Sequence, residues 1–368
     1  MDFTITRFGD FALFKYGKMP KKSEIKENGK YPIYSGYRYV GYYDDYNTEA
    51  NHLIIVARGV GGTGDVKLTK ERCYLTNLSI SAQIDESVVL PQYLYYYFSL
   101  RNLRYLDSGS AQSQITISDL EKVEIPLTNI KSQMRIVDCL SMIDYKIRTN
   151  EMINNNLEQQ AKTLYKNWFI DFTPFSSDGN LPDCWRFGTV SDIIQFHDSK
   201  RVPLSSAERE KMVKIYPYYG ATSLMDYVDN YLFDGVYLLL GEDGTVVDSF
   251  GFPILQYVYG QFWVNNHAHI ITGKEGFSVE ELYLFFSLTN IKSIVTGAVQ
   301  QKVSQQNLKQ VPAIIPSKDA LSAFDELIQP IFTQIRNLRD ENVRLADLRD
   351  TLLPKLMSGE LDLSNINF

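Results

Sequence analysis

The chain repeats itself at a displacement of about 188 residues, and this internal repeat limits its possible folds more than any other feature. The clearest matches join Phe98–Asn102 to Phe286–Asn290 and, without a gap, Gly109–Thr116 to Gly297–Ser304. An internal repeat of this length indicates a chain built from two similar bodies. With 368 residues, the chain is long enough for each body to bury its own core.

Each half ends in a segment whose apolar residues step alternately by four and three positions, the pattern of a long helix that packs along another helix. The two segments share one heptad frame. Asn154 and Asn342 occupy equivalent positions in it, as expected if a buried polar pair sets the register. The predicted seam residues are Ile136, Leu140, Ile143, Ile147, Asn154, Leu157, Leu164, Trp168, Phe324, Ile328, Ile331, Ile335, Leu338, Asn342, Leu345 and Leu352.

The body of each half reads as a mixed domain dominated by sheet. His52–Ala57 and Val236–Leu240 are short, rich in β-forming residues and end at glycine clusters, which indicates strands closed by tight turns. Tyr93–Asn102 and Glu280–Asn290 have the pattern of short amphipathic helices. The predicted fold class is therefore α+β, with pseudo-two-fold symmetry. Its predicted segments are a first mixed domain (1–130), a central helix (131–172), a second mixed domain (173–318), a distal helix (319–358) and a C-terminal tail (359–368).

The predicted helices imply a geometry for the two bodies. A helix over residues 136–168 would be a rod of about 50 Å. One body is attached at each end of it, so the second helix must run back along the first, antiparallel to it. That length corresponds to roughly 15 base pairs of duplex. Two dissimilar bodies held at such a spacing would suit a split, asymmetric DNA site.

Three strings in the helical segments resemble the specificity subunits of type I restriction-modification enzymes: Gln133-x-x-Ile136, Leu164–Phe172 and Leu352–Leu361. The resemblance implies a non-catalytic subunit that reads a bipartite DNA site, one half per recognition domain. It also implies two methylation subunits docked on the helices and motor-nuclease subunits that join for cleavage. S-adenosylmethionine, ATP and Mg²⁺ would then act in those partners and not in this chain. The sequence departs from the repeat at one helix start, where Gln133 is matched by Leu321.

Composition excludes a protein that coats nucleic acid by charge alone. The formal net charge is -7, and non-specific affinity for nucleic acid comes mainly from neutralised phosphates. Any DNA surface must be a local patch, and the first 130 residues are neutral whereas residues 173–318 carry an excess of four acidic groups. The three cysteines are far apart and predict no disulfide framework. The sequence shows neither a secretion signal nor a long apolar run, so a cytoplasmic location is expected.

Candidate DNA contacts fall on two recurring features. Glutamine pairs bidentately with adenine, and lysine and arginine contact phosphate or guanine. A polar loop common to both halves carries one set, although the same loop could simply cap a helix at Ser118. Basic clusters early in each half carry further candidate DNA contacts, although these clusters could equally be solvated loops. Arg58 is a separate candidate, and its alternative role is a surface salt bridge. The candidates are Gln112, Ser113, Gln114, Gln300, Gln301, Lys302, Lys18, Lys21, Lys22, Lys200, Arg201 and Arg58.

Some sequence motifs that could indicate a ligand or metal site are better explained by structural roles. Gly59–Gly64 fits the glycine pattern of a dinucleotide site, but the residues after it alternate like a strand, so a hairpin turn is predicted. His267 and His269 lack further ligands nearby in the sequence and are expected to be structural, with no metal. The sequence contains no methyltransferase string and no complete nuclease pattern. A recognition subunit of a type IIB enzyme and a coiled-coil scaffold without DNA binding stay open as alternatives.

Overall fold

The computed structural model describes residues 2–36, 38–59, 62–107, 114–297 and 300–363. The chain divides into two compact units: unit 1 comprises Met1–Thr149 and Glu341–Phe368, and unit 2 comprises Asn150–Asp340. The division differs from the segments predicted from sequence, because it passes through both long helices instead of leaving them as separate segments. In the described part of the chain, no helix has both the length and the apolar composition to cross a membrane.

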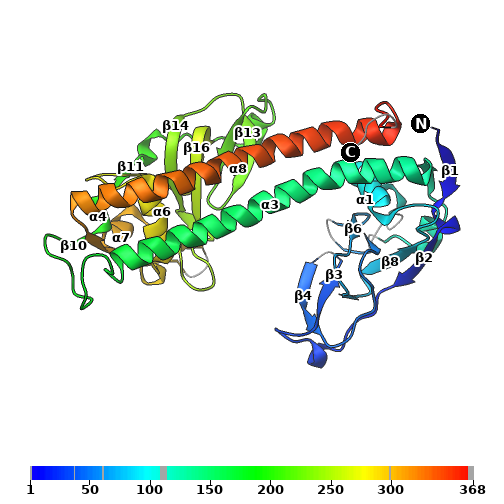
Figure 1. Ribbon diagram of the computed structural model, residues 1–368, viewed down its shortest axis with the longest axis horizontal. Coiled ribbons are helices and arrows are strands. Elements are labelled where there is room, and N and C mark those ends of the chain that lie inside the picture. The colour runs from blue at the N-terminus through cyan, green and yellow to red at the C-terminus, as the bar shows by residue number, and fades with distance from the viewer. Residues whose placement is uncertain (1, 37, 60–61, 108–113, 298–299, 364–368) are drawn as a thin grey trace. The chain divides into compact units, whose positions relative to one another are not determined.

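The two long helices, α3 (Ile130–Phe169) and α8 (Lys318–Ser358), cover 40 and 41 residues (Figure 1). Asn129 accepts a hydrogen bond from the Ser132 amide at the start of α3, and Ser317 does the same for Ala320 at the start of α8. Every predicted seam residue is buried or half-buried. Within unit 1 the helices run in opposite directions, since Ile147 contacts Asn342 whereas the earlier residue Asp144 contacts the later residue Arg349.

Unit 1 is dominated by antiparallel sheet. Its strands form one pair, one four-stranded sheet and one three-stranded sheet, and the contact between β3 and β7 is parallel. In sheet order they are β1 (Thr4–Arg7) with β9 (Glu124–Leu127); β2 (Ala12–Tyr16), β8 (Ser79–Ile84), β5 (Leu53–Val56) and β6 (Val66–Leu68); and β4 (Arg38–Tyr43), β3 (Tyr31–Ser35) and β7 (Tyr74–Leu75). The short helices are α1 (Pro91–Leu100) and α2 (Ile117–Leu120).

Unit 2 repeats this plan. Its strands, in sheet order, are β10 (Arg186–Thr189) with β19 (Pro312–Ile315); β11 (Ile194–Phe196), β17 (Ala268–Gly273), β14 (Phe233–Gly241), β16 (Leu255–Val264), β12 (Tyr216–Tyr219) and β13 (Leu224–Val228); and β15 (Asp243–Gly244) with β18 (Gln301–Lys302). Its short helices are α4 (Val190–Ile193), α5 (Ser206–Arg209), α6 (Val279–Leu288) and α7 (Gln305–Lys309).

The repeat in the sequence is therefore a repeat in the fold. The order β2-β8-β5 in unit 1 returns as β11-β17-β14 in unit 2, and the parallel contact of β3 with β7 returns as β12 with β16. Both units even carry a register break at the same place, after Ile33 and after Tyr218. The predicted α+β class and the predicted helices α1 and α6 are confirmed.

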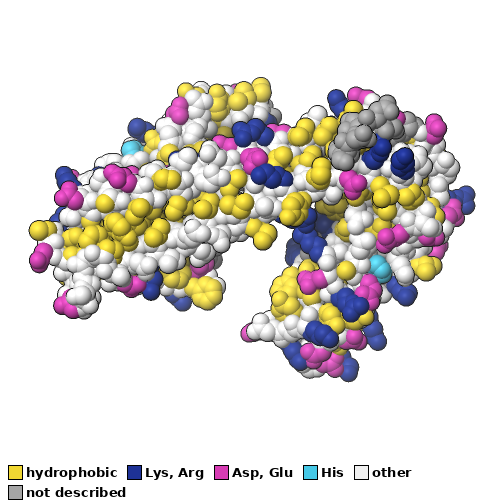
Figure 2. All heavy atoms as spheres, viewed as in Figure 1, with side chains coloured by type: hydrophobic (Ala, Val, Ile, Leu, Met, Phe, Trp, Pro, Cys, Tyr) yellow, Lys and Arg dark blue, Asp and Glu magenta, His cyan; other side chains and the backbone are white. Residues whose placement is uncertain are grey.

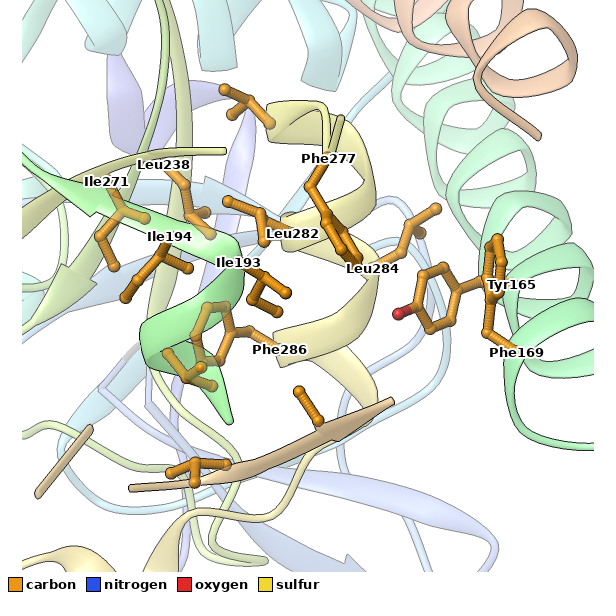
Figure 3. Close-up of a cluster of buried hydrophobic side chains, with 14 of the residues drawn as sticks. Tyr165, Phe169, Ile193, Ile194, Leu238, Ile271, Phe277, Leu282, Leu284 and Phe286 are labelled. Carbon is orange, nitrogen blue, oxygen red and sulfur yellow. The ribbon is translucent and has the colours of Figure 1, made fainter. Parts of the chain in front are cut away.

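Each unit builds its core from its sheet, its short helix and parts of the long helices. In unit 2, residues of α6 pack between the strands and the aromatic side chains Tyr165 and Phe169 of α3 (Figure 3). In unit 1, the C-terminal part of α8 and the residues after it contribute Leu353, Leu356 and Leu363 to the core. Unit 1 thus needs residues from both ends of the chain to complete its interior.

The mismatch between Gln133 and Leu321 has a structural reason. Gln133 is fully buried; its Oε1 accepts from the Leu90 amide at 3.0 Å and its Nε2 donates to the Thr128 carbonyl at 2.7 Å. It thereby satisfies the N-terminus of α1, whose own N-cap, Leu90, has no side-chain acceptor. In unit 2, Ser278 caps α6 by accepting from the Glu281 amide, so the position of Gln133 is free for an apolar leucine.

Candidate nucleic-acid interface

The polar loop common to both halves is joined in each unit to the turn that follows the central strand. In unit 1 the Ile115 amide donates to the Ala57 carbonyl at 2.9 Å, and Arg58 forms a bridge with Gln114. In unit 2 the Val303 amide donates to the Glu242 carbonyl at 2.8 Å. There β15 and β18 place Asp243 opposite Lys302, the counterpart of Arg58 opposite Gln114.

This arrangement brings together candidates that lie far apart in the sequence. Arg58 and Gln114 are neighbours in unit 1. In unit 2, Gln301 and Lys302 form the short strand β18, and Gln300, which is exposed, directly precedes it. Gln112 and Ser113 lie outside the described residues. The loop also caps the helix that follows it, but through Thr116 and Ser304 and not at Ser118.

Gly59 and Gly64 lie between two strands that pair as a hairpin, as predicted for this segment, and Val60 and Gly61 lie outside the described residues. Strands β5 and β6 on either side of it pair antiparallel, with Leu53 opposite Leu68 and Ile55 opposite Val66. A strand therefore follows where a dinucleotide site would require a helix. The hairpin instead places Arg58 just after the interior strand β5, where it forms a bridge with Gln114 of the recurring loop.

Unit 1 presents two arginines at this place. Arg58 is half-buried, and its Nε has no hydrogen-bond partner among the residues that the structure describes. Arg104 is exposed and pairs with Asp65 at 3.2 Å, at the end of the same hairpin. We missed Arg104 in the sequence, although its repeat counterpart, Lys292, is also basic and exposed, and this recurrence could have identified it.

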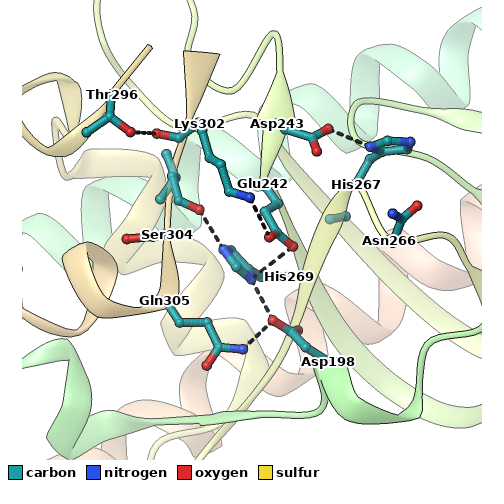
Figure 4. Close-up of polar contacts among 12 residues, drawn as sticks. Asp198, Glu242, Asp243, Asn266, His267, His269, Thr296, Lys302, Ser304 and Gln305 are labelled. Carbon is teal, nitrogen blue, oxygen red and sulfur yellow. Dashed lines mark hydrogen bonds and ion pairs between the residues drawn. The ribbon is translucent and has the colours of Figure 1, made fainter. Parts of the chain in front are cut away.

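Unit 2 presents a different set of charges (Figure 4). The carboxylate of Asp243 lies 2.5 Å from Nδ1 of His267, whose side chain is 46% exposed. Lys302 is 52% exposed, and its Nζ lies 3.6 Å from Glu242. The sequence did not identify Asp243 and His267 as neighbours of this loop, because only the fold brings them there.

Arg201, predicted to contact DNA, has an internal role instead. Its guanidinium donates to the Glu242 carboxylate at 2.6 Å and to the Ala268 carbonyl at 2.8 Å, and only 14% of the side chain is exposed. A guanidinium held in this way by protein acceptors is not presented to a phosphate. Its neighbour Lys200, at the end of the short helix η4 (Asp198–Lys200), is exposed.

The three predicted lysines of unit 1 lie on the surface. Lys18 follows β2, and Lys21 and Lys22 lie at the start of the short helix η2 (Lys22–Glu24). Lys21 pairs with Glu24 at 3.1 Å, an exposed contact of little energetic weight. All three are accessible, and their contact with DNA stays a prediction.

His269 lies at the centre of a buried polar cluster behind the loop of unit 2. Its Nδ1 is 2.6 Å from the Asp198 carboxylate and its Nε2 is 2.8 Å from the Val303 carbonyl oxygen (Figure 4). Burial alone would raise the pKa of Asp198, but hydrogen bonds from His269, the Ile270 amide and Gln305 lower it, so the carboxylate is charged.

Asp198, Glu242 and His269 are the one group among the described residues with the spacing to hold a metal ion, since their ligand atoms lie within 4.8 Å of one another. Two cations of the chain already face these carboxylates. Arg201 contacts both Glu242 and Asp198, and Lys302 contacts Glu242. We therefore assign the cluster to internal ion pairing, in line with the structural role expected for His269.

A family model described as the type I restriction modification DNA specificity domain matches residues 1–159 and 182–344, one match for each half of the repeat. Among named proteins, the chain is 27% identical over 318 residues to the type I restriction enzyme MjaIX specificity subunit of Methanocaldococcus jannaschii. That match covers 78% of this chain and 72% of the relative. The HindI specificity subunit of Haemophilus influenzae is 21% identical over 359 residues, covering 75% and 78% of the two chains.

Among solved structures, the fold is similar to the crystal structure of the type I restriction-modification S subunit from M. genitalium. The TM-score is 0.61 at 19% identity, and the match covers 96% of each chain. At this identity the likeness concerns the fold alone.

Proposed function

This chain belongs to the family of type I restriction-modification DNA specificity proteins, and we propose that it reads a split, asymmetric DNA site, one half with each unit. The candidate reading surface of each unit is the recurring loop together with the turn after the central strand. In unit 1 these are the surroundings of Arg58 and Gln114, and in unit 2 those of Asp243, Gln301 and Lys302.

The observation that carries this proposal is that the backbone of this surface recurs while its side chains differ. Ile115 and Val303 make the same hydrogen bond to Ala57 and Glu242, respectively. At the equivalent bridge, unit 1 pairs Arg58 with Gln114 and unit 2 pairs Asp243 with Lys302. Two surfaces that read different half-sites require the same backbone geometry with different polar side chains. A loop with a purely structural role does not require that combination.

The differing side chains suit different bases. Arginine donates to both acceptors of guanine, and glutamine matches the major-groove edge of adenine. A carboxylate such as that of Asp243 accepts from the amino group of cytosine. We expect unit 1 to read a guanine and unit 2 to read a cytosine.

The long helices are the proposed platform for partner subunits. Large apolar side chains stand exposed on them although the seam is buried, which is typical of a surface that a partner covers. In unit 1 these are Met134, Met142, Tyr145, Val343 and Leu348, and in unit 2 they are Met152, Ile153 and Leu327. Two methylation subunits would dock here, and motor-nuclease subunits would join them.

The chemistry is proposed to lie in those partners, within the cytoplasm. S-adenosylmethionine would be held by the methylation subunits, and ATP and Mg²⁺ by the motor-nuclease subunits. This chain would supply recognition and assembly without a catalytic group. The ion pairs that Arg201 and Lys302 make with Glu242 in the His269 cluster support this division, because cations of the chain already face that carboxylate.

The test is reconstitution. The pure chain, incubated with plasmid, Mg²⁺ and S-adenosylmethionine, should neither methylate nor cut, whereas the chain with its methylation partner should methylate adenines in one split motif. Methylation or cleavage by the chain alone, after contaminants are removed, would contradict the non-catalytic role. Failure of the complex to bind any specific duplex would favour the scaffold without DNA binding.

A further inference from the structure

Phe250 projects from the connection between β14 and β16 in unit 2, at the tip of a hairpin in which Val247 pairs with Pro253. Its side chain is 76% exposed. A single exposed apolar side chain is ordinary on a protein surface, so exposure alone assigns it no role. The backbone around this side chain, however, is held in detail on every side.

Two polar side chains hold the backbone of Phe250. Its amide donates to the Asp248 carboxylate at 2.9 Å, and its carbonyl oxygen accepts from the Asn290 side chain at 2.7 Å. The same oxygen of Asp248 accepts from the Phe252 amide at 2.9 Å. Below the tip, Val246 is fully buried in the core of unit 2. The turn therefore presents the Phe250 ring to the solvent in a defined position.

The tip packs closely against the segment that leads into the recurring loop. Gly251 has a φ of +95°, a conformation that favours glycine. A Cβ atom at this position would lie 2.8 Å from side-chain atoms of Asn290 and Lys292. The Ile291 amide also donates to the Gly251 carbonyl at 3.0 Å. Phe250 is thus placed beside Lys292, which is exposed.

The hairpin tip and the recurring loop can face the same half-site. Thr296 follows Lys292 by four residues and pairs with Lys302 of the loop. Four residues of chain span at most about 14 Å. That length corresponds to roughly four base pairs of duplex. Phe250 is therefore within a few base pairs of whatever Lys302 contacts.

Unit 1 builds the same turn with different residues. Gly64 takes the place of Gly251, since the carbonyl oxygen of each accepts from the amide of the residue before a basic side chain. That side chain is Arg104 in unit 1 and Lys292 in unit 2, and both are exposed. The turn Arg58–Asp65 contains no aromatic residue. The basic group therefore recurs, as suits the phosphates that every half-site shares, whereas the aromatic ring is particular to unit 2.

The lysine beside Phe250 lacks the ion pair of its counterpart. The residue after the glycine is Asp65 in unit 1, where it pairs with Arg104 at 3.2 Å. In unit 2 the residue after the glycine is Phe252. No carboxylate stands at this position to compete with a phosphate for Lys292.

We propose that Phe250 reads the 5-methyl group of a thymine in the half-site of unit 2, with Lys292 on a neighbouring phosphate. The proposal rests on the DNA-reading role inferred for the recurring loop of that unit. The base contacts proposed for the loop are made in the major groove, where thymine is the base that presents a methyl group. An apolar side chain such as phenylalanine contacts that methyl and removes it from water.

The test uses the complex of the chain with its methylation subunits and fluorescent duplexes that carry the motif it methylates. Each thymine of the motif is replaced in turn by uracil, which removes the methyl group and leaves base pairing unchanged. For the wild type we expect one replacement to raise the dissociation constant about fourfold, as burial of one methyl group implies. That thymine should lie in the half-site that Lys302→Ala relaxes. In Phe250→Ala the same replacement should have no effect.

Phe187→Ala is the matched control. Phe187 is also 76% exposed and belongs to unit 2, but it lies on β10, in the ribbon that β10 forms with β19. This variant should respond to every uracil as the wild type does. Because neither ring is buried, both variants should fold like the wild type.

The outcomes separate the two levels of the argument. Equal responses of the wild type and Phe250→Ala to every uracil overturn the reading of a methyl group and leave the proposed function standing. The same holds if Phe250→Ala weakens binding while the wild type tolerates uracil at every position, which would indicate that the ring stacks on a base. Absence of specific binding by the wild-type complex overturns the proposed function, and the role of Phe250 with it.

Discussion

The side-chain amide of Asn342 donates to the backbone carbonyl of Ile147 at 3.2 Å, a polar contact that joins α8 to α3 within unit 1. Asn154, at the equivalent position of the heptad frame, lies in unit 2 and has a buried Oδ1 without a hydrogen-bond partner among the described residues. Polar groups at such positions reduce stability and specify register. Their predicted pairing with each other stays a prediction.

Replacing both asparagines by leucine should raise the thermal midpoint and allow alternative helix pairings. The stability gain comes from removing desolvated amides, and the loss of uniqueness comes from removing their position-specific hydrogen bonds. Calorimetry measures the first, and the number of species in analytical ultracentrifugation measures the second. A variant that is less stable and still uniquely paired would show that these residues do not set the register.

Glu281 should make the stability of unit 2 depend on pH. Burial raises the pKa of Glu281 to about 8. Hydrogen bonds from Ser278 lower this pKa, whereas repulsion from Asp325 and Glu280 raises it further. The unfolded carboxyl ionises near its ordinary value of 4.5, while the folded one stays protonated up to about pH 8. The folded state therefore binds more protons in this window, and stability falls as pH rises through it, by roughly 1.4 kcal/mol per pH unit.

Glu281→Gln should flatten that dependence. The amide keeps an acceptor for the Ser278 backbone but cannot ionise, so the variant should match the wild type near pH 4.5 and exceed it in free energy of unfolding at pH 8. Tyr93→Phe is the control in unit 1, where the equivalent fully buried residue also has a polar atom without a described partner but no carboxyl group. Parallel pH profiles for the wild type and Glu281→Gln would refute the assignment.

Leu356→Ala should destabilise unit 1 through its core. Leu356 is fully buried there, on the C-terminal part of α8, and truncation of such a leucine costs about 2–5 kcal/mol. Hydrogen exchange should show faster opening of β2, β5 and β8, with little change in β14 and β17. Leu348→Ala, on the same helix but 47% exposed, is the matched control and should be nearly neutral. Equal effects of the two substitutions would mean that α8 does not complete this core.

A fragment of residues 1–172 should form a homodimer. It contains the first 149 residues of unit 1 and all of α3, without the part of unit 1 that follows Asp340, and its seam would otherwise expose apolar side chains along the whole helix. Since the two long helices share a heptad frame, the α3 helices of two copies can pair antiparallel, with Trp168 and Phe169 of one copy replacing Leu356 and Met357 in the unit 1 core of the other. With methylation subunits, the dimer should modify a palindrome of the first half-site. A monomeric fragment, or one that modifies the parent motif, would contradict the repeat as the unit of function.

The elements with a strong local signal could be predicted from the sequence. The heptad seam located α3 and α8 to within three residues, and the gapless match from Gly109 to Thr116 identified the loop that recurs in both units. These features depend on periodicity and repetition, which a single chain displays directly.

The side-chain partners could not be predicted, because they depend on contacts between distant segments. Arg201 looked like a free basic residue until the fold placed it against Glu242, 41 residues away. Asp243 and His267 meet only through the pairing of β14 with β17 and β15 with β18. The division into two compact units also depends on such contacts, since Leu361 and Leu363 pack in the same hydrophobic cluster as Phe8.

The most direct test of the account is to map methylated adenines in cells that carry this chain with its methylation partner, for the wild type, Arg58→Ala and Lys302→Ala. The account predicts a split asymmetric motif for the wild type, relaxed at positions of one half only in Arg58→Ala and of the other half only in Lys302→Ala. Each relaxation should correspond to about 1–3 kcal/mol of lost discrimination where the side chain reads a base. A continuous motif, or relaxation of the same half by both variants, would contradict the claim that each unit reads its own half-site.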